Sequence, residues 1–351
     1  MRAAVWHALK DVRVEEKDIP EVTADHVKIK VAWAGICGSD LHEYTTGPST
    51  IPADKPDPLT GVQAPLTLGH EFSGVVEEVG ENVRNLKIGD RVVINPLIIS
   101  GNESDPLLDM YKGFGFVGIN EDGGFADFVT VDAKHVIKLP ENITLQEAAL
   151  IEPTAVAVQA IKESGLKFGE TVSVFGAGPI GLLTIIAAKA AGAKEIFAFD
   201  LFESRLDIAK EVGATHAVNS GEQNPVDYVR SIYPDGVDHT FEVAGVEPTF
   251  NQGISVTRPR GNMTIISLFE KPVSFDPMVL TASGVQLVSS LAYEPDVFQT
   301  TVDLIGTKQL DPSPVITGHI ELENIVTDGF EALLNDKSEA KILVKLNGDG
   351  K

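Results

Sequence analysis

The chain has 351 residues, of which 43% are hydrophobic and 23% are charged, as in ordinary globular proteins of two domains. With 28 Lys and Arg against 51 Asp and Glu, its net charge is −23, so nucleic acid and anionic membranes are poor partners. Cys37 is the only cysteine, which excludes an intrachain disulfide and suits a reducing cytoplasm.

The first part of the chain is predicted to form a lobe of short strands. Its opening residues lack the apolar segment of a signal peptide, and no apolar run reaches the ~18 residues of a membrane span. Strands are expected at 3–6, 12–16, 27–32, 73–79, 125–131 and 136–139. A proline-rich insert at 47–67 and a glycine-rich stretch at 94–124 interrupt them, and a mostly helical segment follows at 144–162.

A strand, a glycine turn and a helix are expected in the stretch 172–192. Residues 172–175 have the side chains of a buried strand, and helix formers follow at 182–191. Between them lies the G-x-G-x-x-G pattern of dinucleotide-binding units, formed by Gly176, Ala177, Gly178, Pro179, Ile180 and Gly181. The alternative is a glycine turn that only joins a strand to a helix.

Each residue of this turn has a physical role in the dinucleotide interpretation. Gly176 permits the tight turn, Gly178 lets a pyrophosphate approach the backbone, and Gly181 lets the helix pack close to the strand. Pro179 suits the first helical position, where its missing N–H costs nothing. The free N–H groups of the first turn then face the anion.

The next expected strand, 195–200, ends in Asp200, about 20 residues past the last glycine, as in dinucleotide-binding units. An acid at this position accepts hydrogen bonds from the adenosine ribose. It also favours NAD over NADP, because a carboxylate repels a 2′-phosphate. Arg205 is expected to lie over the adenine, and the alternative is a charge on a helix surface.

Strands and helices continue to alternate beyond Asp200, which predicts a doubly wound parallel sheet. We expect helices at 204–211, 226–232 and 248–256, and strands at 216–219, 237–243, 263–268 and 286–289. A helix at 295–306 and a tail at 321–346 are expected to return to the strand-rich lobe. The expected domains are therefore 1–153, 154–295 and a returning segment, 296–351.

Candidate metal ligands lie in the strand-rich lobe. Cys37 and His70 offer a thiolate and an imidazole, which zinc prefers, and Glu71 and Glu152 could add carboxylate oxygens. Glu152 lies in an apolar helical stretch, where an unpaired charge would be costly. The alternatives are a small buried thiol and a histidine that only forms hydrogen bonds. No C-x-x-C or H-x-x-x-H spacing decides between these alternatives.

Four motifs occur in an order that resembles the zinc-dependent medium-chain dehydrogenase/reductase family. They are GICGSDLHEY at 35–44, LGHEFSG at 68–74, IEP at 151–153 and GAGPIG at 176–181. The resemblance covers essentially the whole chain, and it is nearest to the butanediol and sorbitol dehydrogenase branch. It implies an α/β protein with a GroES-like, β-rich catalytic domain and a Rossmann domain with a doubly wound parallel sheet.

The resemblance also implies roles for residues of the first lobe. Cys37, His70 and Glu152 match the ligands of a catalytic zinc, and Glu71 matches an acid beside the zinc that exchanges with its bound water. Lys341 occupies the place of a basic residue that pairs with Glu71.

Ser39 and His42 match a proton relay, and Asp40 matches an acid that orients the ligand histidine. The family commonly has a second zinc held by four cysteines, but residues 97–118 contain none. We therefore expect one zinc per chain and a lobe held by packing. The candidate packing residues are Leu107, Leu108, Tyr111 and Phe114.

The expected activity is an NAD-dependent oxidation of a small secondary alcohol to a ketone. A vicinal diol such as 2,3-butanediol, with acetoin as its product, is the preferred substrate because the insert resembles that branch. Sorbitol, xylitol or another secondary alcohol is the alternative. A metal-free NADPH quinone reductase and a non-catalytic cofactor-binding protein are the other candidates. The resemblance implies a homodimer or a homotetramer.

Overall fold

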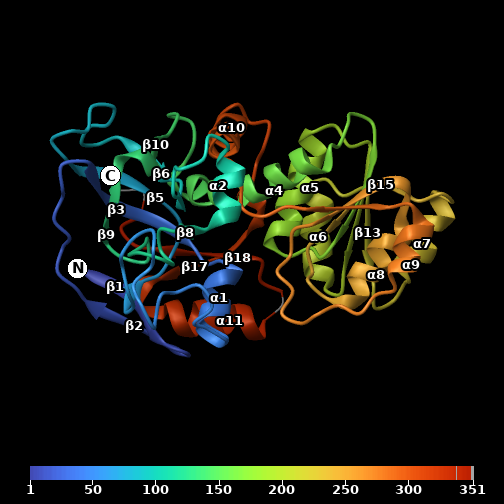
Figure 1. Ribbon diagram of the computed structural model, residues 1–351, viewed down its shortest axis with the longest axis horizontal. Coiled ribbons are helices and arrows are strands. Elements are labelled where there is room, and N and C mark those ends of the chain that lie inside the picture. The colour runs from blue at the N-terminus through green and yellow to red at the C-terminus, as the bar shows by residue number, and fades with distance from the viewer. Residues whose placement is uncertain (337, 349–351) are drawn as a thin grey trace. The chain divides into compact units, whose positions relative to one another are not determined.

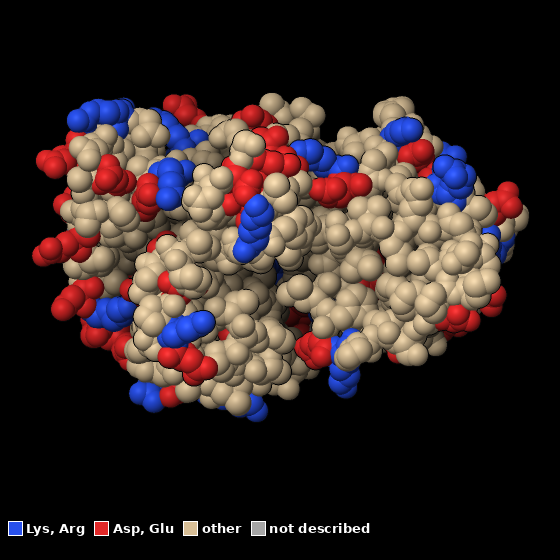
Figure 2. All heavy atoms as spheres, viewed as in Figure 1, with Lys and Arg blue, Asp and Glu red and all other residues tan. Residues whose placement is uncertain are grey.

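The computed structural model describes residues 1–336 and 338–348, which fold into two compact units (Figure 1). The first unit contains residues 1–152 and 294–306 together with the described residues from 316 onward. The second contains residues 153–293 and 307–315. No described helix has the length and apolar character needed to cross a membrane. On the face that Figure 2 shows, acidic and basic side chains are interspersed.

The first unit is built on a seven-stranded sheet with the order β10-β6-β5-β3-β18-β17, with β9 also paired to β3. Two small sheets, β2-β1-β4 and β7-β8, accompany it. The strands are β1 (Arg2–Ala8), β2 (Asp11–Glu16), β3 (His26–Gly35), β4 (Leu66–Thr67), β5 (Glu71–Val79), β6 (Arg91–Ile94), β7 (Leu97–Ile99), β8 (Phe114–Phe116), β9 (Phe128–Asp132), β10 (Val136–Lys138), β17 (Ile316–Glu321) and β18 (Lys341–Lys345).

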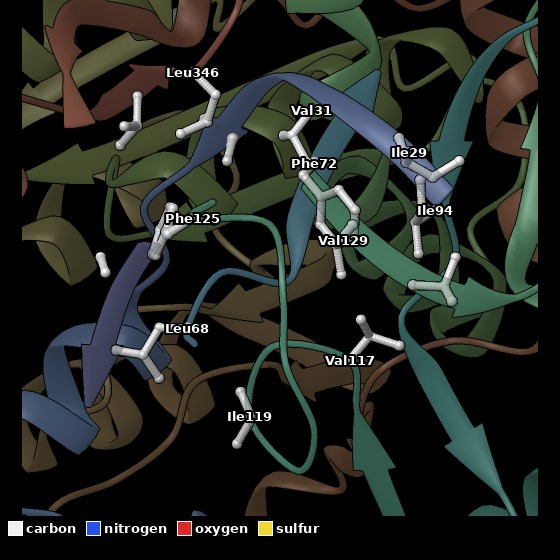
Figure 3. Close-up of a cluster of buried hydrophobic side chains, with 14 of the residues drawn as sticks. Ile29, Val31, Leu68, Phe72, Ile94, Val117, Ile119, Phe125, Val129 and Leu346 are labelled. Carbon is white, nitrogen blue, oxygen red and sulfur yellow. The ribbon is translucent and has the colours of Figure 1, made fainter. Parts of the chain in front are cut away.

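Apolar side chains from several strands of the large sheet form the core of this unit (Figure 3). Ile29 and Val31 alternate along β3, and Phe72 of β5 and Val129 of β9 join them. All four side chains are buried, so this face of the sheet gains the hydrophobic stabilisation that fixes its register. The predicted β-rich lobe is therefore confirmed.

The helices of the first unit are short, except where the chain leaves it. They are α1 (Gly38–Thr45), α2 (Pro106–Lys112), α3 (Leu145–Ala149), the start of α4 (Ile151–Ser164), α10 (Pro295–Gly306) and α11 (Glu331–Asn335). A 3₁₀ turn (Leu322–Asn324) and a π-helical turn (Ile325–Phe330) precede α11. Cys37 is the N-cap of α1, and the Asp40 carboxylate accepts the Cys37 N–H at 2.9 Å. This cap holds the start of α1 at the end of β3.

The second unit contains a six-stranded parallel sheet with the order β13-β12-β11-β14-β15-β16. Its strands are β11 (Thr171–Phe175), β12 (Glu195–Asp200), β13 (His216–Asn219), β14 (Val237–Glu242), β15 (Thr257–Ile265) and β16 (Gln286–Ser289). Its helices are α5 (Pro179–Ala190), α6 (Glu203–Val212), α7 (Pro225–Ile232), α8 (Glu247–Val256) and α9 (Pro277–Ser283). The predicted Rossmann architecture is confirmed, and the strand order reverses between β11 and β14.

One strand of this sheet begins earlier than its sequence indicates. β15 starts at Thr257 rather than at 263, and its pairing with β14 is irregular between Val237 and His239. Pro259 and Arg260, whose φ is +63°, interrupt the apolar pattern at the irregularity. Such a break looks like a loop in sequence, although the backbone continues along the sheet.

The cysteine-free lobe is held only in part by the packing that its sequence predicts. Leu107 and Phe114 are half-buried, and the Phe114 ring contacts the Phe116 ring at a centroid distance of 5.5 Å. Leu108 and Tyr111 are 48% and 58% exposed, so that expectation is wrong for both. The carboxylate of Asp109 is buried instead, and it accepts the Ser100 hydroxyl and the Gly101 N–H, each at 2.6 Å. A carboxylate that accepts two hydrogen bonds within one short loop fixes that loop by polar contacts.

A second buried polar side chain, Asn120, ties this lobe to the proline-rich insert. Its Oδ1 accepts the Phe116 N–H at 2.9 Å, and its Nδ2 donates to Thr50 O at 3.2 Å and to Asp57 Oδ2 at 2.8 Å. Two segments that are distant in sequence, the lobe and the insert, therefore meet at one amide.

Candidate active site

Two neighbouring strands bring a metal-ligating cluster together in the first unit. Cys37 follows β3, while His70 and Glu71 lie at the start of β5, where Glu71 is directly opposite Gly35 in the antiparallel pair. One ligand atom from each of Cys37, His70 and Glu71 lies within 4.8 Å of the others. A thiolate, an imidazole and a carboxylate this close are a donor set that suits zinc.

Glu71 is held by a buried ion pair with Lys341 of β18. Lys341 Nζ donates to both carboxylate oxygens, at 2.8 and 2.7 Å, and to Ile36 O at 2.9 Å. Burial lowers the pKa of Lys341, but the negative charges of Glu71 and Cys37 outweigh burial and raise it. Lys341 is therefore a cation at neutral pH, and it keeps Glu71 beside the cluster.

Gly35 makes room for this pair. A Cβ added to Gly35 would overlap the Glu71 Oε2 atom. Any other residue at position 35 would therefore displace the carboxylate from Lys341. Sequence reasoning did not single out Gly35, although a glycine that ends a strand two residues before the cysteine is a signal of close approach.

The His70 ring lies between two polar side chains of α1. Its Nδ1 is 3.5 Å from Asp40 Oδ1, and its Nε2 is 3.2 Å from Ser39 Oγ. Burial by itself lowers the pKa of His70, whereas Asp40 and Cys37 raise it, and the net shift is well upward. Nδ1 and Asp40 Oδ1 have no hydrogen-bond partner in the described chain. These two atoms face each other, so Asp40 is placed to orient the ring through Nδ1 and leaves Nε2, on the Ser39 side, for a bound group.

Glu152 is in the first turn of α4 and is buried. Its charge is among those that raise the pKa of Lys341, after Glu71 and Cys37. The 4.8 Å cluster in the described chain contains Cys37, His70 and Glu71 but not Glu152. The structure thus brings three of the four predicted ligands together, and the role of Glu152 remains a prediction.

The two predicted relay residues lie on the same short helix. Ser39 is at its start, beside the His70 ring, and His42 lies about one turn further along α1. Both side chains are half-buried, and His42 Nδ1 is 3.1 Å from Thr46 Oγ1. A path from the buried cluster toward solvent along α1 is consistent with this arrangement.

The predicted dinucleotide turn has the geometry that its glycines require. Gly176 has φ of +99°, and a Cβ on Gly181 would overlap the Gly176 carbonyl oxygen. Gly178 is the N-cap of α5, and Pro179 occupies its first helical position. Ile180 lies in the same turn and is half-buried. The first turn of α5 therefore offers N–H groups to an anion without a side chain on Gly178 in the way.

Asp200 supports this turn in addition to ending β12. Its Oδ2 accepts the Ala177 N–H at 2.7 Å, and its Oδ1 accepts N–H groups of the two residues that follow it. The Arg205 guanidinium lies over the Phe202 ring, and its Nη1 is 4.0 Å from the position of a Cβ on Gly178. Asp200 and Arg205 thus both lie beside the glycine turn.

Comparison with known proteins identifies the family. A family model described as "Alcohol dehydrogenase GroES-like domain" matches residues 23–141. A second model, described as "Zinc-binding dehydrogenase", matches residues 179–307. The (R,R)-butanediol dehydrogenase of Bacillus subtilis is 42% identical over 99% of this chain and 100% of its own length. The chain belongs to the zinc-binding dehydrogenase family.

A solved structure and a second curated relative agree with this assignment. The crystal structure of 2R,3R-butanediol dehydrogenase from Bacillus subtilis superposes with a TM-score of 0.93 at 42% identity, covering 98% of this chain and 99% of that one. The sorbitol dehydrogenase of Bacillus subtilis is 30% identical over 99% of this chain and 98% of its own length. The resemblance read from the motifs is therefore confirmed.

Proposed function

We propose that this chain is a zinc- and NAD-dependent dehydrogenase that interconverts 2,3-butanediol and acetoin. The observation that carries the proposal is the cluster of half-buried Cys37 with buried His70 and Glu71 in the GroES-like unit. The full-length similarity to butanediol dehydrogenases supports the substrate class. A half-buried thiol beside a buried histidine and carboxylate favours a metal-dependent enzyme over a metal-free NADPH quinone reductase or a non-catalytic protein.

The donor set fits one zinc per chain. Cys37, His70 and Glu152 would hold it, with Glu71 as an occasional fourth ligand. His70 would use Nε2, because Asp40 faces its other ring nitrogen and would orient it. A second zinc held by cysteines is excluded, since Cys37 is the only cysteine of the chain.

The chain's own residues handle the proton and the geometry. When bound, zinc would polarise the alcohol oxygen, and NAD would accept the hydride. Ser39 would take the alcohol proton through its hydroxyl and pass one to His42, which releases it toward solvent. Replacing His42 with alanine should slow alcohol oxidation most near neutral pH, with partial rescue as buffer concentration or pH rises. An unchanged pH–rate profile would assign the proton to another route.

Asp200 supports the preference for NAD. Its carboxylate lies at the end of β12, beside the turn that would hold the pyrophosphate, and would repel a 2′-phosphate. Arg205 would extend toward the adenine half of the coenzyme. Replacing Asp200 with glycine should raise KM for NAD and improve the use of NADP. Equal efficiency with both coenzymes in the unmodified enzyme would refute this assignment.

The insert supports a small diol as the substrate. Its first residues are anchored to α1, because Glu43 accepts the N–H groups of Ser49 and Thr50 at 2.9 and 2.7 Å. The insert is thereby fixed to the helix that carries Ser39 and His42. A diol presents a second hydroxyl, and a site that pairs it rejects analogues without it far better than an apolar pocket rejects a methylene group.

A substrate and metal panel tests the proposed function. Purified enzyme should oxidise 2,3-butanediol with NAD at a kcat/KM far above that for 2-butanol, sorbitol or xylitol. Removal of the metal by a chelator should abolish turnover, and elemental analysis should find about one zinc per chain. Higher kcat/KM for sorbitol or xylitol would replace the diol with a polyol, and full activity without metal would refute the zinc role.

Two further properties belong to the same proposal. Replacing Cys37 with serine should remove zinc and turnover but leave the fold intact, because the Rossmann sheet does not use this residue. We expect a homodimer or homotetramer, which sedimentation or light scattering would measure. The single cysteine has no partner for an intrachain disulfide, which suits a reducing compartment and supports a cytoplasmic location.

A further inference from the structure

Glu242 is a completely buried carboxylate with no part in the chemistry described above. It is the last residue of β14 and lies in register with Phe175 of β11 and Ile265 of β15. Its side chain is therefore at the carboxyl edge of the parallel sheet. This is the edge at which open α/β sheets bind their ligands.

One carboxylate organises two segments at this edge. Oε1 accepts the N–H groups of Ala244 and Gly245 at 3.1 and 3.0 Å, and the hydroxyl of Thr249 at 2.7 Å. Oε2 accepts the hydroxyl of Ser267, which lies just beyond β15. The continuous segment from the turn after β14 into α8 and the segment after β15 are thus tied to one side chain. In the described chain no lysine or arginine pairs with Glu242.

The segment that Glu242 holds packs against the dinucleotide turn. A Cβ on Gly176 would come within 3.1 Å of Ala244 N, so the two turns are in close contact. Asp200 holds the same dinucleotide turn from the β12 side through the Ala177 N–H. A dinucleotide that lies across the reversal of strand order has its adenosine on the Asp200 side. Its nicotinamide half therefore extends toward the end of β14.

We propose that Glu242 is a positioning residue for the nicotinamide half of the coenzyme, and that its charge favours the oxidised form. This inference rests on the proposed use of NAD. The nicotinamide ring of NAD⁺ is positively charged and that of NADH is neutral. A buried negative charge without a cationic partner acts at short range through a medium of low dielectric constant, so it stabilises NAD⁺ more than NADH. Its hydrogen bonds fix the segments of Gly245 and Ser267, its charge acts across space, and it does not contact the reacting atoms.

Replacing Glu242 with glutamine removes the negative charge and keeps nearly the same side-chain shape. The amide oxygen can keep the three donors on Oε1, and the Ser267 hydroxyl can turn to accept from the new NH₂ group. The dissociation constants of NAD⁺ and NADH are measured by calorimetric titration without alcohol. We expect the dissociation constant of NAD⁺ to rise about tenfold. The dissociation constant of NADH should rise less than about threefold.

Asp238 provides a matched control at the opposite end of the same strand. Its carboxylate accepts the Thr171 N–H at 2.8 Å and hydroxyl at 2.7 Å, and it pairs with Arg258 at 2.7 Å. Replacing Asp238 with asparagine should lower the unfolding temperature but leave the ratio of the two dissociation constants unchanged. A ratio that changes equally in both variants would overturn the proposal.

A second variant tests the positioning role if glutamine at 242 prevents folding. Replacing Ser267 with alanine keeps the charge but loosens the segment after β15, so both dissociation constants should rise together. Unchanged constants in this variant, or equal increases for NAD⁺ and NADH in Glu242→Gln, would overturn the proposal. If the unmodified protein binds neither NAD⁺ nor NADH, the proposed function fails as well. If it binds both and Glu242→Gln changes nothing, only the role of Glu242 fails.

Discussion

The buried pair between Glu71 and Lys341 allows a quantitative test of the site. Replacing Lys341 with methionine removes the cation and leaves a completely buried carboxylate without its partner. Loss of one member of a buried, hydrogen-bonded pair typically costs about 3–5 kcal/mol of unfolding free energy. Lys345 of the same strand is the control, because its pair with Glu321 spans 3.5 Å and both side chains are about half exposed. Replacing Lys345 with methionine should cost at most about 1 kcal/mol.

The assay is denaturant unfolding at pH 7, first with zinc removed and then with zinc restored. Because the pKa of Lys341 is raised, its contribution is complete below the ~10.4 of an unfolded lysine and is lost only as the pH rises through the folded-state value. Neutral pH therefore measures the full effect. Zinc should reduce the loss in Lys341→Met, since Glu71 can then turn its charge toward the metal.

A double variant checks the cause of the loss. Replacing Glu71 with glutamine in the Lys341→Met background removes the uncompensated charge, so most of the lost stability should return. The reasoning is refuted if Lys341→Met costs no more than Lys345→Met. It also fails if the double variant is no more stable than Lys341→Met.

Two further predictions concern other contacts of the first unit. Gly35→Ala should lower the unfolding free energy by about 1–3 kcal/mol and reduce the zinc content, because the added Cβ displaces Glu71. Gly38→Ala is the control: nothing lies within 4 Å of its added Cβ, so the unfolding free energy should change by less than about 1 kcal/mol. Burial raises the pKa of Asp127, but hydrogen bonds from Arg2 lower it more, so Asp127→Asn should cost about 1–3 kcal/mol at neutral pH. That difference should shrink as the pH falls below the ~3.9 of an unfolded aspartate and through the folded-state pKa, as urea unfolding at stepped pH values would show.

Local chemistry made the coenzyme unit predictable from the sequence. A buried strand, a positive φ at Gly176 and a close helix contact at Gly181 occur within a few residues. Each of these constraints restricts the residue type at its position, so the sequence shows it. The alternation of strands and helices then fixes the parallel sheet. The early start of β15 was missed because Pro259 and Arg260 conceal a strand that is bent rather than ended.

The site of the first unit was only partly predictable. Their side-chain chemistry makes Cys37 and His70 candidate metal ligands. Their proximity, however, depends on the register of β3 and β5, which the sequence does not reveal. The pairing of Glu71 with Lys341 came from family resemblance alone, since 270 residues separate them. The roles of Gly35 and Glu242 depend on contacts across strands and were not foreseen. Asp109 was missed because an acidic residue on a short helix is expected at the surface.

The central position of β18 has a consequence for the biosynthesis of the protein. β18 lies between β3 and β17, and Lys341 at its first position completes the pocket of Glu71. A ribosome-bound chain that has emerged only through β5 exposes Cys37, His70 and an uncompensated Glu71, because the cation that pairs with Glu71 lies 270 residues further along the chain. The pocket of Glu71 therefore stays incomplete until β18 has been synthesised. Zinc bound before β18 pairs with β3 would meet a Glu71 carboxylate without its cation, so the native form of the proposed metal site is reached only late in synthesis.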